Sequence, residues 1–304
     1  MSTAPSYDRF WWLLTRLNPK QIENCFVRWI QSLPDEDKSK LIAIDGKHLR
    51  GSAARGKQVY LVSAWDSNRS LLLGQVKAHE KSNEITAIPD LLDSCDLTNA
   101  TVTIDAAGCQ TDIADKIRDG GGEYMIALKG NQGTLHAEVV NFFTQTREVG
   151  CENADCKTSS SCEKGHGRIE ERDVAVTNQL DSLDCRVNWK ALKSLIEITS
   201  RRTIKGKTTE ERRFYISSLE PTPELAGNIV RGHWTIENRL HCNMDVNFCE
   251  DANWATSGNT AVNLAALKRL TSTIICIDLG GTRQAAWDDP WTLQLLSRIF
   301  EVDL

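Results

Sequence analysis

The sequence predicts an α/β fold in which helices flank a mixed β-sheet. Three strand-like runs follow one another at residues 41–45, 58–65 and 70–77, a succession that indicates an antiparallel meander. Two further runs, at residues 100–105 and 123–128, alternate with helical segments, and this alternation implies parallel pairing. A sheet of order 3-2-1-4-5 places the first strand beside the fourth.

Helical segments surround these strands. Residues 5–17 and 19–33 each carry bulky apolar groups, which predicts two short helices. Ser82 or Asn83 is a suitable N-cap for a helix between the third and fourth strands. A last long helix is expected over residues 261–277, followed by a short helical flap in the tail.

The chain changes character after the fifth strand. Residues 150–166 are small and polar and carry cysteines. Strand-like runs then follow at residues 168–177, 194–203 and 212–218. We interpret this part as a mainly β insertion before the last core helix. The predicted parts are a short N-terminal helical region, the first part of the core, the insertion, and the core completion with the C-terminal helices, at residues 1–40, 41–147, 148–220 and 221–304.

Composition indicates a soluble globular protein with a sizeable core, because 40% of the 304 residues are hydrophobic and 25% are charged. No run is long enough to predict a membrane span, and the apolar patch near the N-terminus is too short for a secretion signal. We therefore expect a cytoplasmic protein.

The ten cysteines are scattered and form no CxxC pair, so reduced thiols are expected. Cys151, Cys156, Cys162 and His166 are potential zinc ligands within a short span. Their spacing fits no common zinc knuckle, and a polar loop that carries cysteines is the favoured interpretation.

The net charge of −5 is unusual for a nucleic-acid-binding protein. Net charge does not exclude a local basic surface, however. Basic residues cluster around Lys47 and Arg50, and again between Arg201 and Arg213. Each cluster is also compatible with an ordinary solvated face.

The stretch of residues 231–251 has a helical pattern with an unusual polar row. His233, Glu237, His241 and Asp245 are each four residues apart, so a helix stacks them along one side. Two imidazoles and two carboxylates in one row are rarely an arrangement for stability. A helix with this row alone is also compatible with a solvated polar face.

Three acids occupy positions that suit a metal site. Asp45 ends the first strand, Asp105 ends the fourth, and Glu237 lies on the late helix. Carboxylates held side by side are costly unless a cation lies between them. Mg²⁺ prefers oxygen ligands, and two ions about 4 Å apart support in-line phosphoryl displacement. Sequence spacing by itself does not establish that the three acids meet.

Seven segments carry a resemblance to a known family. They are IAIDGKHLRGS, KSNEITAIPDLLD, VTIDAAGCQ, LKGNQ, GHGRIEERD, FYISSL and HWTIENRLH, at residues 42–52, 81–93, 102–110, 128–132, 165–173, 214–219 and 233–241. In this order they resemble the bacterial H-repeat-associated transposases, which are insertion-sequence enzymes of the DDE superfamily. The similarity extends from about residue 5 to residue 277.

The resemblance implies a ribonuclease-H-like core and a specific chemistry. Asp45, Asp105 and Glu237 are then the catalytic, metal-binding acids, with two Mg²⁺ or Mn²⁺ ions per site. The implied activity is cleavage of a DNA strand and its transfer to another DNA. The implied partners are double-stranded DNA, at element ends and target, and a second copy of the chain when DNA is bound, without any membrane.

Several positions depart from the family pattern. The N-terminal helical region is shorter than usual, Cys242 stands where Trp is common, and residues 252–255 lack the usual basic character. His233 and Met244 replace Arg and Lys of a related signature. The alternative is therefore a catalytically silent remnant that binds DNA or protein, and DNA binding is expected to be weak and sensitive to salt.

Eight further residues are candidates for DNA contact. They are Lys47, Arg50, Lys129, Asn131, Gln132, Arg168, Arg172 and His241. For each, an ordinary polar turn or a solvent-facing side chain is the competing interpretation. His241 is also placed to orient the Glu237 carboxylate or a water, or to serve as a structural histidine.

Overall fold

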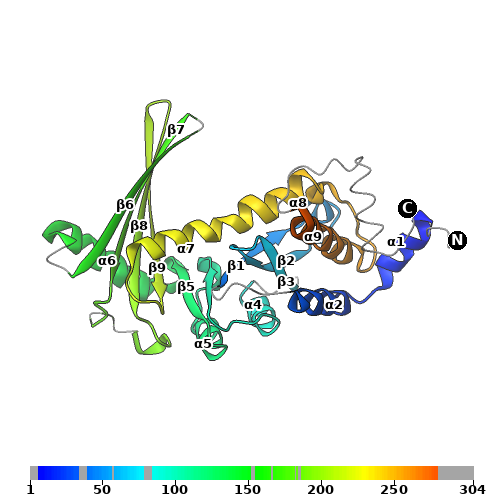
Figure 1. Ribbon diagram of the computed structural model, residues 1–304, viewed down its shortest axis with the longest axis horizontal. Helices are drawn as coiled ribbons and strands as arrows, with labels where there is room; N and C mark the ends of the chain where they lie inside the picture. The colour runs from blue at the N-terminus through cyan, green and yellow to red at the C-terminus, as the bar shows by residue number, and fades with distance from the viewer. Residues whose placement is uncertain are drawn as a thin grey trace.

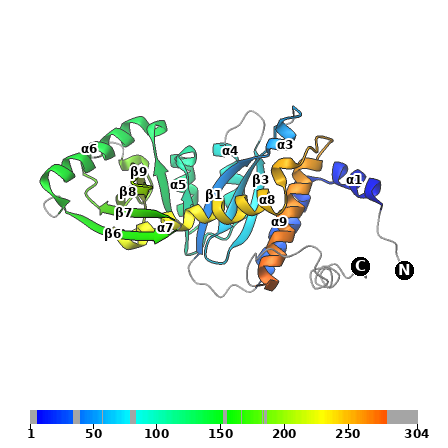
Figure 2. The same ribbon diagram turned by 90° about the horizontal axis from the view of Figure 1, so that it is seen from above.

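The computed structural model describes residues 6–33, 40–56, 58–78, 84–151, 155–165, 167–181, 183 and 186–279. A single mixed sheet of nine strands runs through the molecule in the order β3-β2-β1-β4-β5-β9-β8-β7-β6 (Figure 1). Figure 2 shows the strands β6–β9 with α6 towards one end, the core strands in the middle, and α9 with α1 towards the other end.

The first five strands form the predicted core of the sheet. They are β1 (Lys40–His48), β2 (Tyr60–Asp66), β3 (Leu71–Ala78), β4 (Ala100–Ile104) and β5 (Glu123–Leu128). Strands β1, β2 and β3 pair antiparallel, whereas β4 pairs parallel with both β1 and β5. The predicted order 3-2-1-4-5 and the predicted meander are both confirmed.

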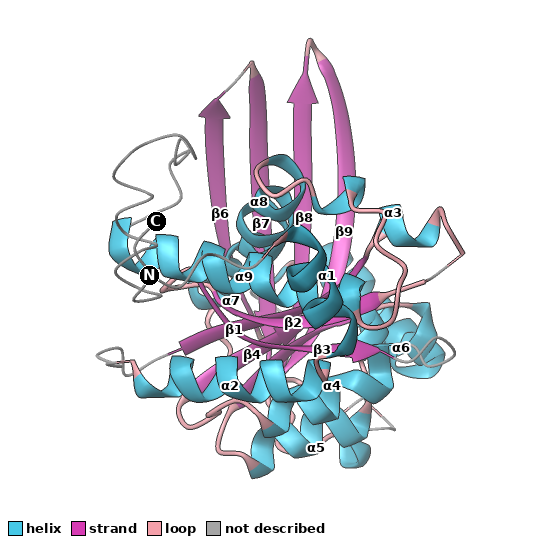
Figure 3. Cartoon of the chain, turned by 90° about the vertical axis from the view of Figure 1, so that its right-hand side faces the viewer, coloured by secondary structure: helices cyan, strands magenta, loops and turns pink. Residues whose placement is uncertain are grey.

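Helices cover both faces of this core (Figure 3). Helices α4 (Glu84–Asp93) and α5 (Thr111–Asp119) pack on one face, where Ile42 and Ile44 of β1 are buried. On the other face, Ala43 of β1 packs in one cluster with residues of the π-helix η5 (Ile236–His241) and of α8 (Cys242–Val246). Helix α7 (Pro223–Thr235), which precedes η5, also contacts β1. Because side chains alternate along a strand, Asp45 lies on the same face as Ala43.

The insertion strands extend the core sheet. Strand β9 (Lys207–Ser217) pairs with β5, and β8 (Ser194–Ile204), β7 (Arg168–Thr177) and β6 (Cys156–Gly165) follow in antiparallel order. Their distal ends project as a long arm away from the core (Figures 1 and 3).

One secondary-structure prediction in the insertion was wrong. Residues 150–166 were interpreted as a polar loop, yet most of them form strand β6. Strand β6 is the outer edge of the sheet and most of its side chains are exposed. An edge strand with both faces in water needs no apolar alternation, so the periodicity that reveals buried strands is missing.

The late helix also differs from the prediction. Helix α7 begins at Pro223, well before residue 231, because proline fits the first turn of a helix, where its missing N–H costs nothing. The regular α-helix then changes to the π-helix η5 before α8. Beyond α8 the chain turns, and a 3₁₀ turn η6 (Glu250–Ala252) follows, so the predicted single helix over residues 231–251 is three consecutive helical pieces and a turn.

The terminal helices pack together beside the core. Helices α1 (Tyr7–Arg16) and α2 (Pro19–Ser32) confirm the two predicted N-terminal helices, and both contact α9 (Thr260–Leu279). Contrary to expectation, residues 260–277 of α9 are long and apolar enough to meet the length and composition test for a membrane span. With 56% of that stretch buried inside the protein, α9 has the character of a core helix. The predicted helical flap at residues 280–304, and the caps Ser82 and Asn83, lie outside the described residues.

The remaining helical elements join these parts. They are α3 (Arg50–Ala53), α6 (Gly133–Val149) and the 3₁₀ turns η1 (Ala106–Gly108), η2 (Gly130–Gln132) and η4 (Arg186–Asn188). All nine cysteines within the described ranges are free thiols, which agrees with the expected reduced state.

Candidate active site

Asp45 and Asp105 follow directly paired residues of two neighbouring strands. Ile44 of β1 is in register with Ile104 of β4, and the two strands run parallel. The next residue of each chain segment is therefore an aspartate at the same edge of the sheet. Asp45 still lies within β1, whereas Asp105 comes just after β4 and caps the 3₁₀ turn η1.

Backbone N–H groups hold the Asp105 carboxylate. Its Oδ1 accepts hydrogen bonds from Ala107 N at 3.0 Å and Gly108 N at 3.4 Å. This tight turn requires glycine, because a Cβ on Gly108 would lie 2.4 Å from Ile104 Cγ2 and 2.8 Å from Ile88 Cδ1. The local sequence thus fixes Asp105 at the end of its strand.

The loop after β5 braces the loop after β4. Asn131 Nδ2 donates to the Ala106 carbonyl at 2.6 Å, and Gln132 Nε2 donates to the Cys109 carbonyl at 2.7 Å. The predicted DNA-contact amides of Asn131 and Gln132 therefore bind the protein itself, and their first role is to position the turn that carries Asp105.

Asp45 is an unusual carboxyl group. Burial raises its pKa from 3.8 to about 7, against the hydrogen bond that its Oδ1 accepts from Gly46 N at 2.9 Å. The negative charges of Glu237, Asp105 and Glu84 raise the pKa further. These influences indicate that three other carboxylates, from three different segments, lie within electrostatic reach of Asp45.

Buried polar side chains lie next to Asp45 in the sheet. Asp45 pairs with Ser63 of β2, which pairs with Gln75 of β3, and directly paired residues of antiparallel strands share one face. Ser63 is fully buried and Gln75 is 3% exposed. Neither the Ser63 hydroxyl nor the Gln75 amide has a hydrogen-bond partner within the described structure. Asp45, Ser63 and Gln75 thus form a polar row across β1, β2 and β3, and the last two of these side chains are buried.

Two histidines lie behind the acids. His241 Nδ1 is 3.5 Å from Asp45 Oδ2, while His233 donates to the Thr103 backbone on β4. Burial lowers the pKa of His233 to about 4 and that of His241 to about 3. Both imidazoles are therefore neutral at physiological pH.

Glu237 reaches the site from the opposite direction. It lies in the first turn of η5 and is exposed to solvent. Burial of part of its carboxylate raises its pKa, the nearby Arg213 lowers it, and the negative charge of Asp105 raises it. Glu237 is thus the accessible member of the acid group.

The π-helix η5 lies within the polar row predicted from the sequence. Its hydrogen bonds are spaced five residues apart, so the row is carried by more than one kind of helix. His233 contacts β4, His241 contacts Asp45 and Asp245 pairs with Lys47, while Glu237 faces solvent. The four residues of the predicted row thus border the same site, although the helix that carries them is not one continuous α-helix.

Comparison with known proteins decides the family. The profile described as "Transposase DDE domain" matches residues 36–274. This chain belongs to the DDE transposase family. It is 36% identical over 282 residues to "H repeat-associated putative transposase YhhI" of Escherichia coli (strain K12), covering 90% of this chain and 74% of that protein. It is 37% identical over 283 residues to "Putative transposase YncI" of Escherichia coli O157:H7, covering 88% and 70%.

A more distant similarity is to the solved structure "Cryo-EM structure of piggyBac transposase synaptic complex with hairpin DNA (SNHP)". The TM-score is 0.42 at 10% sequence identity, over 93% of this chain and 57% of that chain. The resemblance to the H-repeat-associated transposases seen in the sequence is confirmed by the curated relatives.

The acids of this transposase-family chain suit a hard divalent cation by type. Oxygen ligands are what Mg²⁺ and Mn²⁺ prefer, and the mutual repulsion felt by Asp45 is what a bound cation would relieve. Within the described ranges, no three His, Cys, Asp or Glu side chains are close enough to hold one ion as they stand. Asp45 and Asp105 each accept hydrogen bonds from the backbone through Oδ1.

The other candidates for DNA contact have different surroundings. Lys47 is only 8% exposed, and its Nζ lies 2.5 Å from Asp245 Oδ1, which argues against the predicted DNA contact. Arg50 and Lys129 are exposed, as such a contact requires. His241 faces Asp45 with little exposure, so its geometry supports the orienting role, towards Asp45 and not towards Glu237.

Arg168 and Arg172 line a groove that the sequence did not reveal. The groove has a volume of about 610 Å³ and lies between the insertion arm and α7. Its basic lining residues are Arg168, Arg172, Arg201, Arg202, Arg213 and Arg231, and its acidic lining residues are Glu170, Glu171, Glu210 and Glu211. The guanidinium of Arg213 lies 4.6 Å from the centre of the Trp234 ring. Because Arg213 also influences Glu237, the groove leads to the acids.

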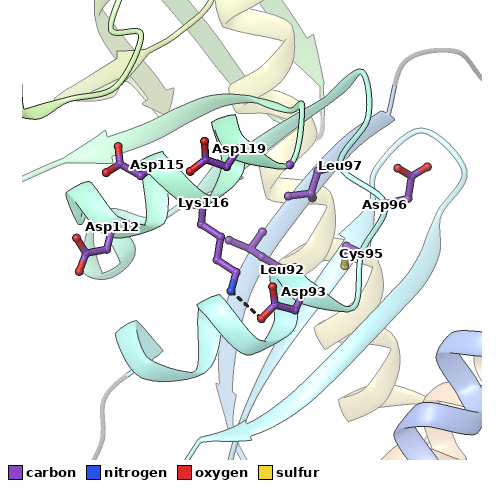
Figure 4. Close-up of a pocket in the computed structure, with 10 residues that line it drawn as sticks. Leu92, Asp93, Cys95, Asp96, Leu97, Asp112, Asp115, Lys116 and Asp119 are labelled. Carbon is purple, nitrogen blue, oxygen red and sulfur yellow. Dashed lines mark hydrogen bonds and ion pairs between the residues drawn. The ribbon is translucent and has the colours of Figure 1, made fainter.

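A second pocket, shown in Figure 4, is separate from the acids of the site. It is lined by residues of α4, α5 and the segment that precedes β4, including Asp93, Asp112 and Asp119. Lys116 Nζ pairs with Asp93 Oδ2 at 2.7 Å. Because this pocket lies near the start of β4 and Asp105 follows its end, the two are at opposite edges of the sheet.

The potential zinc ligands Cys151, Cys156, Cys162 and His166 belong to a different part of the chain from the acids. Cys151 and Cys156 are within hydrogen-bond reach of each other, and Cys162 is exposed on β6. His166 lies outside the described residues. The zinc hypothesis for these four residues therefore gains no support from the arrangement.

Proposed function

We propose that this chain is a DDE transposase-type DNA nuclease and strand transferase that uses two divalent metal ions, Mg²⁺ or Mn²⁺. The observation that carries the proposal is the register of β1 and β4, which puts Asp45 beside Asp105 at one sheet edge. Membership of the DDE transposase family supports it independently.

In this proposal the chain's own acids hold the ions. Asp45 and Asp105 are the ligands from the sheet, and Glu237 is the ligand from the helix cover. Bound ions would activate the attacking oxygen and stabilise the leaving oxygen of a phosphodiester. His241 keeps Asp45 oriented from the buried side, and the Asn131 and Gln132 amides keep the Asp105 turn in place.

The proposed DNA partner lies along the arginine-lined groove. Arg168 and Arg172 form ion pairs with Glu170, at 2.9 Å and 2.7 Å. A DNA phosphate could replace the Glu170 carboxylate as the partner of these two guanidinium groups. Exposed Arg50 and Lys129 extend the basic surface on other sides of the acids. We propose double-stranded DNA, at element ends and target, as the substrate, with a second copy of the chain in the DNA complex.

The silent-remnant alternative is not favoured. All three acids are present, and a bound cation would relieve the burial and repulsion that raise the pKa of Asp45. A decayed site has no reason to retain a buried carboxyl group whose neighbours repel it.

A strand-transfer assay tests the activity. The full chain is incubated with Mn²⁺ or Mg²⁺ and duplexes that carry the ends flanking its own reading frame. Asp105→Asn is expected to abolish nicking and strand transfer while duplex binding is retained. Asp90→Asn, on the exposed side of α4, is the matched control and should behave as the wild type. Equal cleavage by Asp105→Asn and the wild type would refute the proposal.

A further inference from the structure

We infer that Glu84 is a fourth carboxylate of the metal site and that Tyr60 holds it in place. This inference rests on the proposed function, because it concerns the same ions. Glu84 is the first residue of α4, which packs on the face of the sheet opposite to η5. The residue was not a site candidate from the sequence, although it lies within the KSNEITAIPDLLD segment.

The Glu84 carboxylate lies directly against the backbone next to Asp45. A Cβ added to Gly46 would be 2.2 Å from Glu84 Oε1 and 2.6 Å from Glu84 Cδ. The absence of a side chain at Gly46 is therefore what leaves room for this carboxylate. Sequence and packing together bring Glu84 to the strand residue that follows the first acid of the site.

Tyr60 fixes the orientation of Glu84. Its hydroxyl donates a hydrogen bond to the Glu84 carboxylate, and its Cε1 would lie 2.8 Å from a Cβ on Gly46. The Tyr60 ring stacks on the His48 ring, with centroids 5.6 Å apart and 22° between the planes. The phenol, the carboxylate and the Gly46 backbone thus form one packed unit beside Asp45.

The competing interpretation is an ordinary acid in the first turn of a helix, where a carboxylate stabilises the N-terminus. Such an acid normally points into solvent, away from other negative charges. Glu84 is half-buried, and its charge interacts unfavourably with those of Asp45 and Asp105. Burial and the charge of Asp105 both raise the pKa of Glu84. A carboxylate kept in such a place is better explained by a cation that all of these acids share.

Calorimetric titration of the full chain with Mn²⁺ is the test. Glu84→Gln is expected to weaken Mn²⁺ binding by about 10-fold or more, as the loss of a ligand or its support does at metal sites. Asp45→Asn should weaken it at least as much, and Asp90→Asn on the same helix should leave it unchanged. Tyr60→Phe, which keeps every acid, should give a smaller loss in the same direction.

Gly46→Ala provides a second, independent variant. It keeps all four carboxylates, and its methyl group displaces Glu84, whose carboxylate position it occupies, together with the Tyr60 ring that holds Glu84. We expect a loss of Mn²⁺ affinity similar to that of Glu84→Gln. This variant also covers the case in which Glu84→Gln does not fold, which circular dichroism reveals.

A melting experiment separates the two interpretations of Glu84. In EDTA, Glu84→Gln should raise the melting temperature, since it removes repulsion between acids, whereas loss of a helix-stabilising acid should lower it. Wild-type affinity for Mn²⁺ in both Glu84→Gln and Gly46→Ala, with affinity lost in Asp45→Asn, would overturn the inference alone. No Asp45-dependent Mn²⁺ binding by the wild type would overturn the proposed function and this inference with it.

Discussion

His241 Nδ1 lies 3.5 Å from Asp45 Oδ2, so a side chain of the π-helix η5 contacts an acid of the central strand β1. The imidazole is largely buried, and its Nε2 has no hydrogen-bond partner within the described part of the chain. Burial, followed by the positive charges of Arg269 and Lys47, lowers the pKa of His241 to about 3. Because the buried His241 ring lies against the Asp45 carboxylate, it limits the orientations that this carboxylate can adopt.

This contact predicts that His241 acts through Asp45. His241→Ala should weaken Mn²⁺ binding by about 10-fold, the usual effect of removing a group that orients a metal ligand, and should slow strand cleavage. Duplex affinity should stay within a factor of about two, because the imidazole contacts Asp45 and does not line the groove. A loss of duplex binding with unchanged Mn²⁺ affinity would instead assign His241 to DNA contact.

The raised pKa of Asp45 predicts a pH-dependent stability without metal. Between its ordinary value of 3.8 and its folded value of about 7, the unfolded chain loses the proton and the folded chain keeps it. Raising the pH through this window therefore favours the unfolded state, and the stability contributed by the protonated carboxyl is lost by pH 8.

Asp45→Asn tests that effect, since asparagine does not titrate. In EDTA, the melting temperature of Asp45→Asn should exceed that of the wild type by several degrees at pH 8 and by little at pH 4. Added Mn²⁺ should then raise the wild-type melting temperature at pH 8 but not that of the variant. A difference independent of pH would contradict the raised pKa.

The sequence predicted the strand-end positions of Asp45 and Asp105, for a physical reason. Asp45 and Asp105 each follow a run of mostly buried residues typical of a strand, and parallel strands that cross over in one direction end at one edge. The local sequence patterns were therefore sufficient to predict that these two acids lie at strand ends. The order of the five core strands followed from the same patterns together with the family resemblance.

The helix side and the insertion could not be predicted in the same way. A change from α- to π-helix depends on how η5 packs on β1, and the i+4 spacing of His233, Glu237 and His241 does not report it. Strand β6 has no buried face, so it carries no periodicity. Glu84 reaches Asp45 only because Gly46 leaves space for it, a contact between residues that are far apart in sequence.

The buried ion pair of Arg269 and Glu250 predicts a structural requirement beside the site. Arg269 is fully buried and Glu250 is 1% exposed, with Nη2 of Arg269 3.1 Å from Oε2 of Glu250. Arg269→Met leaves an uncompensated buried carboxylate, and such a change costs roughly 3–5 kcal/mol of stability. Urea unfolding should show this loss, whereas the double variant Arg269→Met/Glu250→Leu should recover much of it. A single variant as stable as the wild type would show that Glu250 finds another partner.

The arginine-lined groove predicts how DNA binding responds to salt. Arg213→Ala removes a cation that lies over Trp234 at the groove wall, near Glu237. If Arg213 contacts a phosphate, the slope of log affinity against log salt concentration should become shallower by about 1, with weakening that is similar for all duplex sequences. Arg186→Ala is the matched control. Arg186 is paired with the carboxylate of Asp181, as Arg213 is with that of Glu211, but Arg186 lies outside the groove. Fluorescence anisotropy with an element-end duplex and a scrambled duplex measures both slopes. Equal slopes for Arg213→Ala, Arg186→Ala and the wild type would place the DNA on another surface, for which exposed Arg50 and Lys129 are the next candidates.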